Sequence, residues 1–515
     1  MERGRRMIKL REFNTPYPNP YDVGSWGACA GVPPAEERGE ARRQIQEDVK
    51  RYSERFTYCT RTDKAWMVCL HQAGVLDAGT AARVLSALVE LEQSGPEGKQ
   101  GGGERDVIPA LGGDEDLGSL INLGRTMQEP MSRMQMRDQM LDFFEHLFPL
   151  IESVIETAEN NVDTIMPGHT HLSQANPITY ALYLLSVADN LFRGLGQLEK
   201  AYELVNLNSG GCGSCSGTVW PVDRMELTRL LGFDDVLEVT YDCEASQDHT
   251  LAVLFALTNL LTSISKTTKD FQIWGLEEMD FFRIDPAWGG LSSMMPQKCH
   301  PGGDNEGIRF FTCSAIGETM AAIATCKGEP HQDLVIMMNL PPARAAEALA
   351  QGKCAVRLFQ GVLEHMVPQK EKLLDYVRQG YSCTTEVAVY MVRELGYGGR
   401  RAHRILATLV RLARERGLPA PDLTGEMLDE AARAVEEEPP QIDTETLQKY
   451  LDPVRFIETH SNLGGPAPAE ARRMLKKRRG MLAEAEQRQA DRAARVAEGH
   501  RRLAAEIDAI LEQAG

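Results

Sequence analysis

The stretch that decides the fold is "MSRMQMRDQMLDFFEHLFPLIESVIETAENNVDT", residues 131–164. Its apolar side chains recur at helical spacing, and its length predicts a helix of roughly nine turns. Comparable segments follow at 176–206, 250–279, 304–326 and 342–366. Long amphipathic helices with few strands bury their apolar stripes most easily against one another. We therefore predict an all-α protein built around an extended helix bundle.

Composition agrees with this fold class and limits the partners. Hydrophobic residues make up 43% of the 515 residues and aromatic residues only 6%, a balance that favours a helical globular protein. The net charge of -18 argues against nucleic acid as the main partner, because phosphate binding needs a basic surface. An anionic substrate remains compatible, since a buried site can be locally basic. Helices this long expose much apolar surface in one chain, which predicts oligomerisation.

The cysteines and the apolar segments predict a cytoplasmic location without membrane contact. The 11 cysteines are scattered singly, except for Cys212 and Cys215, as in a reduced protein. The N-terminal "MERGRRMIKLREF" is basic but has no apolar run that is long enough for a signal peptide. The segment 251–266 is the most apolar, yet it is too short and polar for a membrane span and is interpreted as a core helix.

Changes in helix length and turn content suggest three domains, at 1–117, 118–372 and 373–515. In the first domain, residues 77–95 predict a capped helix with Asp77 as N-cap and Gly95 as the stop. In the last domain, a polar helix over 467–511 has alternating charge signs, which indicate a solvated or a packing arm.

A loop interrupts the helices at "WGGLSSMMPQKCHPGGDNEGIRFF", residues 288–311. The pairs Gly289-Gly290 and Gly302-Gly303 can act as hinges, and a hinged polar loop is typical of a lid over a site. Within it, Ser292, Ser293, Lys298 and His300 could all face one ligand. The alternative is a surface loop with ordinary turn residues.

Several segments, in order, resemble one enzyme superfamily. The lid "SSMMPQKCHP" is similar to the SSxMPxKxNP loop of the fumarase/aspartase/argininosuccinate lyase superfamily. Argininosuccinate lyases match further at "NLGRT" (122–126), "MPGHTHLSQANPIT" (166–179), "GCGSCSGTVWPVDRMELTRLLGF" (211–233) and "SNLGGPAPAEARRML" (461–475). The resemblance spans roughly residues 50–480. It implies a three-domain all-α lyase in which four subunits form a twenty-helix bundle, with active sites shared between subunits.

The resemblance also implies an activity and its residues. Family members eliminate fumarate from a succinyl group by breaking a Cβ–N or Cβ–O bond. Ser292 is then the base, with Ser293 as the rival assignment, and Lys298 clamps the carboxylate that gains charge. His171, with Thr170, would bind substrate and assist protonation of the leaving group. The resemblance further assigns substrate-binding roles to Arg125, Thr126, Gln128, Gln174, Met295 and His300. For His171 the alternative is a histidine packed at the start of a helix.

The departures from the family change the pocket for the departing amine, and at Gln128 and His300 they also change acid-binding positions. Argininosuccinate lyases have GRSRND where this chain has "GRTMQE" (124–129), an asparagine at His300, and a QEDK run where this chain has "VIMM" (335–338). A site that loses buried hydrogen bonds changes specificity. The first hypothesis is therefore a small dicarboxylate substrate of the N-(1,2-dicarboxyethyl) type with a less polar amine. The alternatives are a genuine argininosuccinate lyase and a non-catalytic, crystallin-like homologue.

One further motif is Cys212-Gly-Ser-Cys215, which could suggest a metal or redox site. A single CxxC is a weak signal, and no second Cys/His pair lies at ligand spacing. Close packing around the glycines is the favoured interpretation. We predict no cofactor and no metal.

Overall fold

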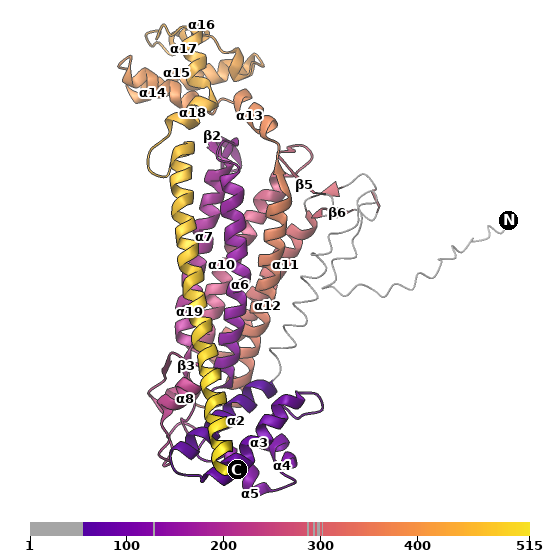
Figure 1. The fold of residues 1–515 in the computed structure, drawn as a ribbon. Coiled ribbons are helices and arrows are strands. Elements are labelled where there is room, and N and C mark those ends of the chain that lie inside the picture. The colour runs from indigo at the N-terminus through magenta and orange to yellow at the C-terminus, as the bar shows by residue number, and fades with distance from the viewer. Residues whose placement is uncertain (1–54, 127–128, 286–287, 292–293, 296–298, 301) are drawn as a thin grey trace, which may run out of the picture.

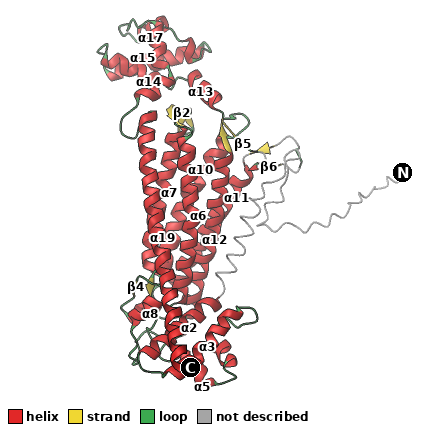
Figure 2. Cartoon of the chain, in the orientation of Figure 1, coloured by secondary structure: helices red, strands yellow, loops and turns green. Residues whose placement is uncertain are grey.

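The computed structural model describes residues 55–126, 129–285, 288–291, 294–295, 299–300 and 302–515. They form an elongated bundle of long helices with a smaller group of helices at each end (Figure 1). The bundle consists of α6 (Met131–Glu159), α7 (Tyr180–Val205), α10 (Asp248–Trp274), α11 (Gly302–Gly328) and α12 (Val335–His365). The all-α fold class predicted from the sequence is confirmed, as Figure 2 shows.

Two helix starts were predicted wrongly. The helix expected from 176 begins at Tyr180, because residues 165–179 form a hairpin of β1 (Ile165–Thr170) and β2 (Ser173–Thr179). The Thr179 hydroxyl accepts a hydrogen bond from the Leu182 amide at 3.1 Å and so caps α7. The helix expected from 342 begins at Val335 instead, so "VIMM" forms its first turn and the two prolines lie inside it.

At one end of the bundle lies an N-terminal group of helices with its own core. Asp77 caps α3 (Ala78–Ser94) by accepting from Thr80, and Gly95 ends that helix at φ +73°, as predicted. The other elements of this end are α2 (Arg55–Gln72), α4 (Glu104–Ala110), α5 (Glu115–Gly118), the 3-10 turn η3 (Ser119–Asn122), α8 (Arg224–Leu230) and α9 (Thr240–Ala245). Trp66, Leu85 and Leu88 are fully buried in its core.

At the opposite end, shorter helices enclose a second small core around Ile405, Leu409 and Leu447. They are α13 (Lys370–Gln379), α14 (Thr384–Arg393), α15 (Gly399–Glu415), α16 (Gly425–Ala434), α17 (Thr444–Leu451) and α18 (Pro453–Thr459), with the 3-10 turn η5 (Ala420–Asp422).

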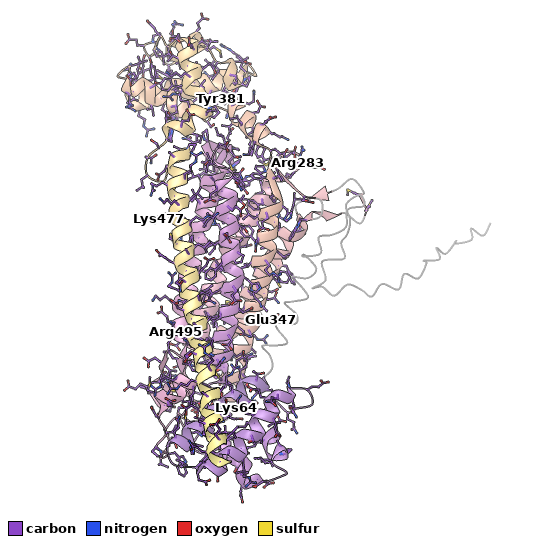
Figure 3. The ribbon with its side chains drawn as sticks, viewed as in Figure 1. Lys64, Arg283, Glu347, Tyr381, Lys477 and Arg495 are labelled. Carbon is purple, nitrogen blue, oxygen red and sulfur yellow. The ribbon has the colours of Figure 1, made fainter. Side chains whose placement is uncertain are left out.

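The final helix, α19 (Pro468–Ala514), returns along the whole bundle (Figure 1). At 47 residues it spans about 70 Å. Leu475 and Leu482 pack into the bundle core, and Leu503 and Ile507 pack into the N-terminal core. Its residues Arg478 and Arg488 pair with Asp189 and Glu199 of α7, and Figure 3 shows Lys477 and Arg495 spaced along the helix. Of the two interpretations of this segment, the packing arm is therefore correct. The domain boundaries at 117 and 372 stay predictions.

Short strands complete the described part of the chain. They pair as β3 (Leu207–Asn208) with β4 (Asp235–Val236), β5 (Phe282–Ile284) with β8 (Met366–Pro368), and β6 (Gly290–Leu291) with β7 (Cys299–His300).

The helix α10 is the one described helix that is long and apolar enough to cross a membrane by length and composition. Its residues Leu254, Leu257 and Leu261 are buried in the bundle core against neighbouring helices. This packing fits the core helix predicted from the sequence.

Candidate active site

Arg125 lies at the N-terminal end of the bundle and is almost fully buried. It forms a buried ion pair with Asp63 of α2. The Arg125 Nε donates to the Ile121 carbonyl at 2.9 Å. The centroid of the Trp66 ring lies 6.0 Å from the guanidinium carbon of Arg125. Burial raises the pKa of Asp63, and the Arg125 charge opposes that rise. Arg125 is therefore held in a fixed place next to the predicted substrate segment.

Glu129 connects this segment to the glycine-rich loop at 210–217. Its buried carboxylate accepts from the backbone amides of Gly211 at 2.8 Å, Cys212 at 3.1 Å and Ser214 at 3.3 Å. It also accepts from the Thr126 hydroxyl at 3.2 Å. The loop can surround the carboxylate because it turns tightly at Gly213, where φ is +54° and a Cβ would lie 2.3 Å from the Gly217 carbonyl oxygen.

Two thiols and a second carboxylate lie beside Glu129. The Cys212 thiol donates to Glu244 at 3.0 Å, and Arg224 donates to the Cys243 sulfur at 3.3 Å. Burial raises the pKa of Glu244 to about 7. The Cys212 thiol and the Arg224 charge lower the pKa of Cys243, whereas burial and nearby carboxylates raise the pKa of Cys212.

The ligand atoms of Glu129, Cys212 and Glu244 lie within 4.8 Å of one another, close enough to bind one metal ion. Sulfur and carboxylate oxygen are zinc ligands. Both oxygens of Glu129, however, already accept from loop donors, so a metal would have to displace those hydrogen bonds. The donor set therefore fits the loop-anchoring role better than a metal-binding role.

His171 lies at the other end of the bundle, in the turn between β1 and β2. His171 and Leu172 form the two central positions at φ +53° and +59°, the left-handed backbone that a tight hairpin turn of this type requires. The side chains of Thr170 and His171 are exposed, as is Leu172 at 86%. His171 thus lies on a hairpin turn and not at the start of a helix.

Gln174 packs on the neighbouring C-terminal group of helices. Its amide lies so close to Gly380 that a Cβ there would come within 2.3 Å of Gln174 Oε1. The Gln174 Nε2 is buried and has no hydrogen-bond partner among the described residues.

The base of the predicted lid is formed by packing. Trp288 is buried, stacks on His365 with ring centroids 4.7 Å apart, and lies against Gly361 of α12. The two ends of the lid then pair as β6 and β7, with Gly290 opposite His300. Met295 is half exposed at 45%. Ser292, Ser293, Lys298 and Gln128 lie outside the described residues.

A single chain does not bring Arg125 and His171 together. Arg125 contacts α2 at the lower end of Figure 1, whereas the β1–β2 hairpin with His171 lies at the upper end. The 29-residue helix α6 separates the two ends, which corresponds to about 43 Å. A site that contains both residues would therefore require more than one copy of the chain.

A cavity of about 270 Å³ opens beside α6, between α2 and the start of α12. It combines apolar and polar groups, and the "VIMM" segment contributes Met338. Its lining residues include Arg55, Tyr58, Met131, Gln135, Met338 and Asn339.

Sequence reasoning missed Asp63, Glu129, Arg224, Cys243 and Glu244. Glu129 ends the quoted "GRTMQE" segment, and its acidic type at that place was the available signal. Asp63 had no comparable signal, because its burial appears only in the folded chain. Arg224, Cys243 and Glu244 meet through tertiary folding, and their spacing alone gave no signal.

Comparisons with known proteins show the family of this chain. A lyase family model matches residues 109–317, and a model of the argininosuccinate lyase C-terminal region matches residues 381–458. The chain is 31% identical over 459 residues to argininosuccinate lyase of Methanothrix thermoacetophila, covering 87% of this chain and 92% of the relative. It is 27% identical to argininosuccinate lyase 1 of Shouchella clausii, covering 87% and 91%.

Solved structures show the same fold. A crystal structure of EDDS lyase in complex with formate has a TM-score of 0.86 at 25% identity and covers 93% of this chain and 97% of that one. Class II fumarase from Schistosoma mansoni, at 15% identity and a TM-score of 0.63, shares the fold and covers 79% and 90%. The chain therefore belongs to the fumarase/aspartase superfamily, in its argininosuccinate lyase branch, and is a fumarate-releasing carbon–nitrogen lyase.

Proposed function

We propose that this lyase cleaves an N-(1,2-dicarboxyethyl) compound whose amine is less polar than arginine. The observation that carries the proposal is the "VIMM" segment, which stands where the family has its QEDK run. Met338 of that segment lines the cavity beside α6, together with Met131 and Asn339. A pocket with methionine side chains favours an amine with apolar surface.

The proposed chemistry removes a proton from the carbon next to one carboxylate and then breaks the neighbouring C–N bond. Ser292 is the base, and Lys298 stabilises the dianion that forms, because such a charge needs cations and donors aimed at it. His171 assists protonation of the departing amine. Arg125 and Thr126 hold the succinyl part. These roles rest on the motif matches in the lid, the hairpin and the segment at 122–126.

The separation of Arg125 from His171 supports a site that is shared between subunits of a homotetramer. Exposed apolar side chains on the bundle supply surface for such an assembly. They include Phe255 of α10 at 53% exposure, and Phe310 and Met320 of α11 at 51% and 60%.

The test for the substrate is the reverse reaction. Purified protein is incubated with fumarate and a library of amines, and products are identified by mass as fumarate adducts. We expect adducts with amines that carry apolar substituents, and none with Ser292→Ala protein, whose rate should fall by about a thousandfold or more. If Ser292→Ala matched the unmodified protein on every product, the serine base would be wrong.

Argininosuccinate is the second candidate substrate, because the curated relatives at 27–31% identity carry that activity in their names. Release of fumarate from argininosuccinate, followed by its absorbance, separates the two candidates. A protein that turned over no compound in either direction would match the crystallin-like alternative.

A further inference from the structure

Glu129 and Glu244 are two buried carboxylates without a part in the proposed chemistry, and they lie next to each other. Glu129 is 2% exposed and Glu244 is 3% exposed. Their carboxylate oxygens lie within 4.8 Å of each other and of the Cys212 sulfur. Two like charges at this separation in a buried place repel each other strongly. Without a cation between them, the two carboxylates therefore carry one charge and one proton.

We propose that Glu244 keeps a proton and so allows the ionised Glu129 to position Thr126 and the glycine-rich loop for catalysis. Both glutamates are then positioning residues, because they act on the substrate through Thr126 and the loop. This role in catalysis rests on the proposed function, which assigns Thr126 to the succinyl part. The assignment of the proton to Glu244 rests on the contacts of the two carboxylates and does not depend on the substrate.

The hydrogen-bond donors decide which of the two carboxylates is charged. Glu129 accepts from three backbone amides of the glycine-rich loop, those of Gly211 at 2.8 Å, Cys212 at 3.1 Å and Ser214 at 3.3 Å. It also accepts from the amide and the hydroxyl of Thr126, at 3.3 Å and 3.2 Å. Within the described residues, Glu244 accepts only from the Cys212 thiol, at 3.0 Å, and a thiol is a weak donor. The five donors stabilise the charged form of Glu129, so the proton belongs to Glu244.

The neighbouring cations are engaged with other groups. Arg224 of α8 donates to the Cys243 sulfur at 3.3 Å and to three backbone carbonyl oxygens. Arg125 forms its ion pair with Asp63. Arg133 donates to a backbone carbonyl oxygen of α7 at 2.7 Å. In the part of the chain that the structure describes, no ion pair therefore compensates a charge on either carboxylate.

The groups that surround Glu244 favour its neutral form. Glu129 faces it from the segment before α6, Cys212 faces it from the glycine-rich loop, and Asp333 adds negative charge from the segment before α12. Burial, Glu129 and Asp333 raise the pKa of Glu244 to about 7, and the hydrogen bond from Cys212 opposes this rise. Glu244 is therefore neutral below about pH 7 and charged above it.

A charge on Glu244 would act on the substrate segment through Glu129. The ionised pair would repel, and the Glu129 carboxylate is the common acceptor of Thr126 and the loop amides. The Thr240 hydroxyl of α9 also donates to the Cys215 carbonyl at 2.8 Å, which ties α9 to the same loop. Repulsion therefore loosens the contact between Thr126 and the loop, and the reaction should slow as the pH rises through about 7.

The first test detects the proton without any substrate. Infrared difference spectra of the full-length protein, recorded from about pH 5 to about pH 9, should show a protonated carboxyl band. The band should disappear with a midpoint near pH 7, and Glu244→Gln should remove it. Cys212→Ala removes a hydrogen bond that favours the charged form, so it should move the midpoint upward. Cys215→Ala is the matched control from the same loop and should leave the midpoint unchanged.

The second test measures the pH profile of the lyase reaction on the substrate found by the amine screen. Glu244→Gln has no proton to lose. Its kcat/KM relative to that of the unmodified protein should therefore rise about tenfold or more between about pH 6 and about pH 8.5. Cys212→Ala should move the fall in kcat/KM to higher pH by the same amount as the infrared midpoint. A role in folding alone would change stability and leave this profile in place.

The third test addresses Glu129 itself. Glu129→Gln removes the charge that the five donors require, and it should lower kcat/KM by about tenfold or more at every pH. It should also move the infrared midpoint of Glu244 downward, because the neighbouring negative charge is gone. Glu129→Asp keeps the charge and should retain more activity than Glu129→Gln.

Three results would overturn the proposal. They are the absence of a carboxyl band that Glu244→Gln removes, identical pH profiles of Glu244→Gln and unmodified protein, and one zinc ion per chain, since a metal ion would take the place of the proton. A protein that shows the band but cleaves no dicarboxylate would contradict the proposed function, and the proton would still be assigned to Glu244.

Discussion

At the scale of single residues, buried charges define the N-terminal end of the candidate site. Arg125 and Asp63 are both almost inaccessible, with side-chain exposures of 1% and 0%. Each depends on the other, because a lone charge in that position has neither water nor a counter-charge. The pair therefore holds the arginine that the motif assigns to the succinyl group.

Asp63→Asn should destabilise the protein by about 3–5 kcal/mol, because it leaves Arg125 buried without its counter-charge. Denaturant unfolding at one fixed protein concentration measures the loss. The control is Glu498→Gln, which breaks the exposed Arg501–Glu498 pair and should change little. Equal effects of the two substitutions would contradict the role of burial.

Glu244 should make stability depend on pH. Burial raises its pKa to about 7 from the ordinary 4.5, so the folded state keeps a proton that the unfolded chain releases between those values. This stabilising contribution is complete below about pH 4.5 and is lost as the pH rises through about 7. Glu244→Gln should therefore gain in melting temperature relative to the unmodified protein between about pH 5 and pH 8. A constant difference across that range would argue against a buried, protonated Glu244.

At the scale of elements, a few close contacts position the hairpin turn and the base of the predicted lid. The β1–β2 hairpin presents His171 from a left-handed turn, and the lid is anchored where Trp288 lies on α12. Gly361 makes that anchor possible, since a Cβ there would lie 2.1 Å from the Trp288 ring. The packing of the anchor thus decides where the lid begins.

Gly361→Ala should displace Trp288 and with it the base of the lid. We expect a loss of about 1–3 kcal/mol from the free energy of unfolding, as for other overpacked sites. We also expect kcat to fall by about tenfold or more, because catalysis is sensitive to small misplacements. Thermal unfolding and steady-state kinetics on the substrate found by the amine screen measure the two effects.

The control for this prediction is Gly480→Ala on α19, where the added Cβ meets open space. Alanine is the better helix former, so this variant should be as stable as the unmodified protein or up to about 1 kcal/mol more stable. If Gly361→Ala kept full stability and kcat, Trp288 would not anchor the lid.

At the scale of the whole molecule, the bundle separates the two halves of the proposed site. Arg125 and His171 lie at opposite ends, and α19 fastens the ends along the bundle through pairs such as Arg478–Asp189 and Arg502–Glu226. These ion pairs hold α19 against the rest of the chain at both ends of the bundle. The predicted site therefore requires neighbouring copies of the chain.

Mixing two inactive variants should restore activity if sites are shared. His171→Ala and Ser292→Ala proteins are unfolded together and refolded, and their hybrids should regain activity that neither variant has alone. Hybrid assemblies contain some sites that carry neither substitution, whereas sites within one chain would never do so. Refolding each variant separately is the control, and a mixture as inactive as both parents would exclude a shared site that divides these two residues between chains.

The sequence by itself determined the fold class and the family, because apolar periodicity and motif order are local properties of the chain, and the chemistry of the lid stays a prediction. The cap at Asp77 was predictable for the same reason. Helix starts at Tyr180 and Val335 were not, since strand pairing and packing around a double proline overrode local propensity. The cytoplasmic location and the domain limits stay predictions.

Only the tertiary structure decided which residues meet. Asp63 contacts Arg125, and Cys212 contacts Glu244, although each pair is 32 or more positions apart in the sequence. Burial then changes their proton affinities, because the cost of a charge depends on the whole surrounding volume and not on neighbours in the sequence. One chain holds both halves of the predicted site and keeps them the length of a bundle apart, because Arg125 precedes α6 and His171 follows it.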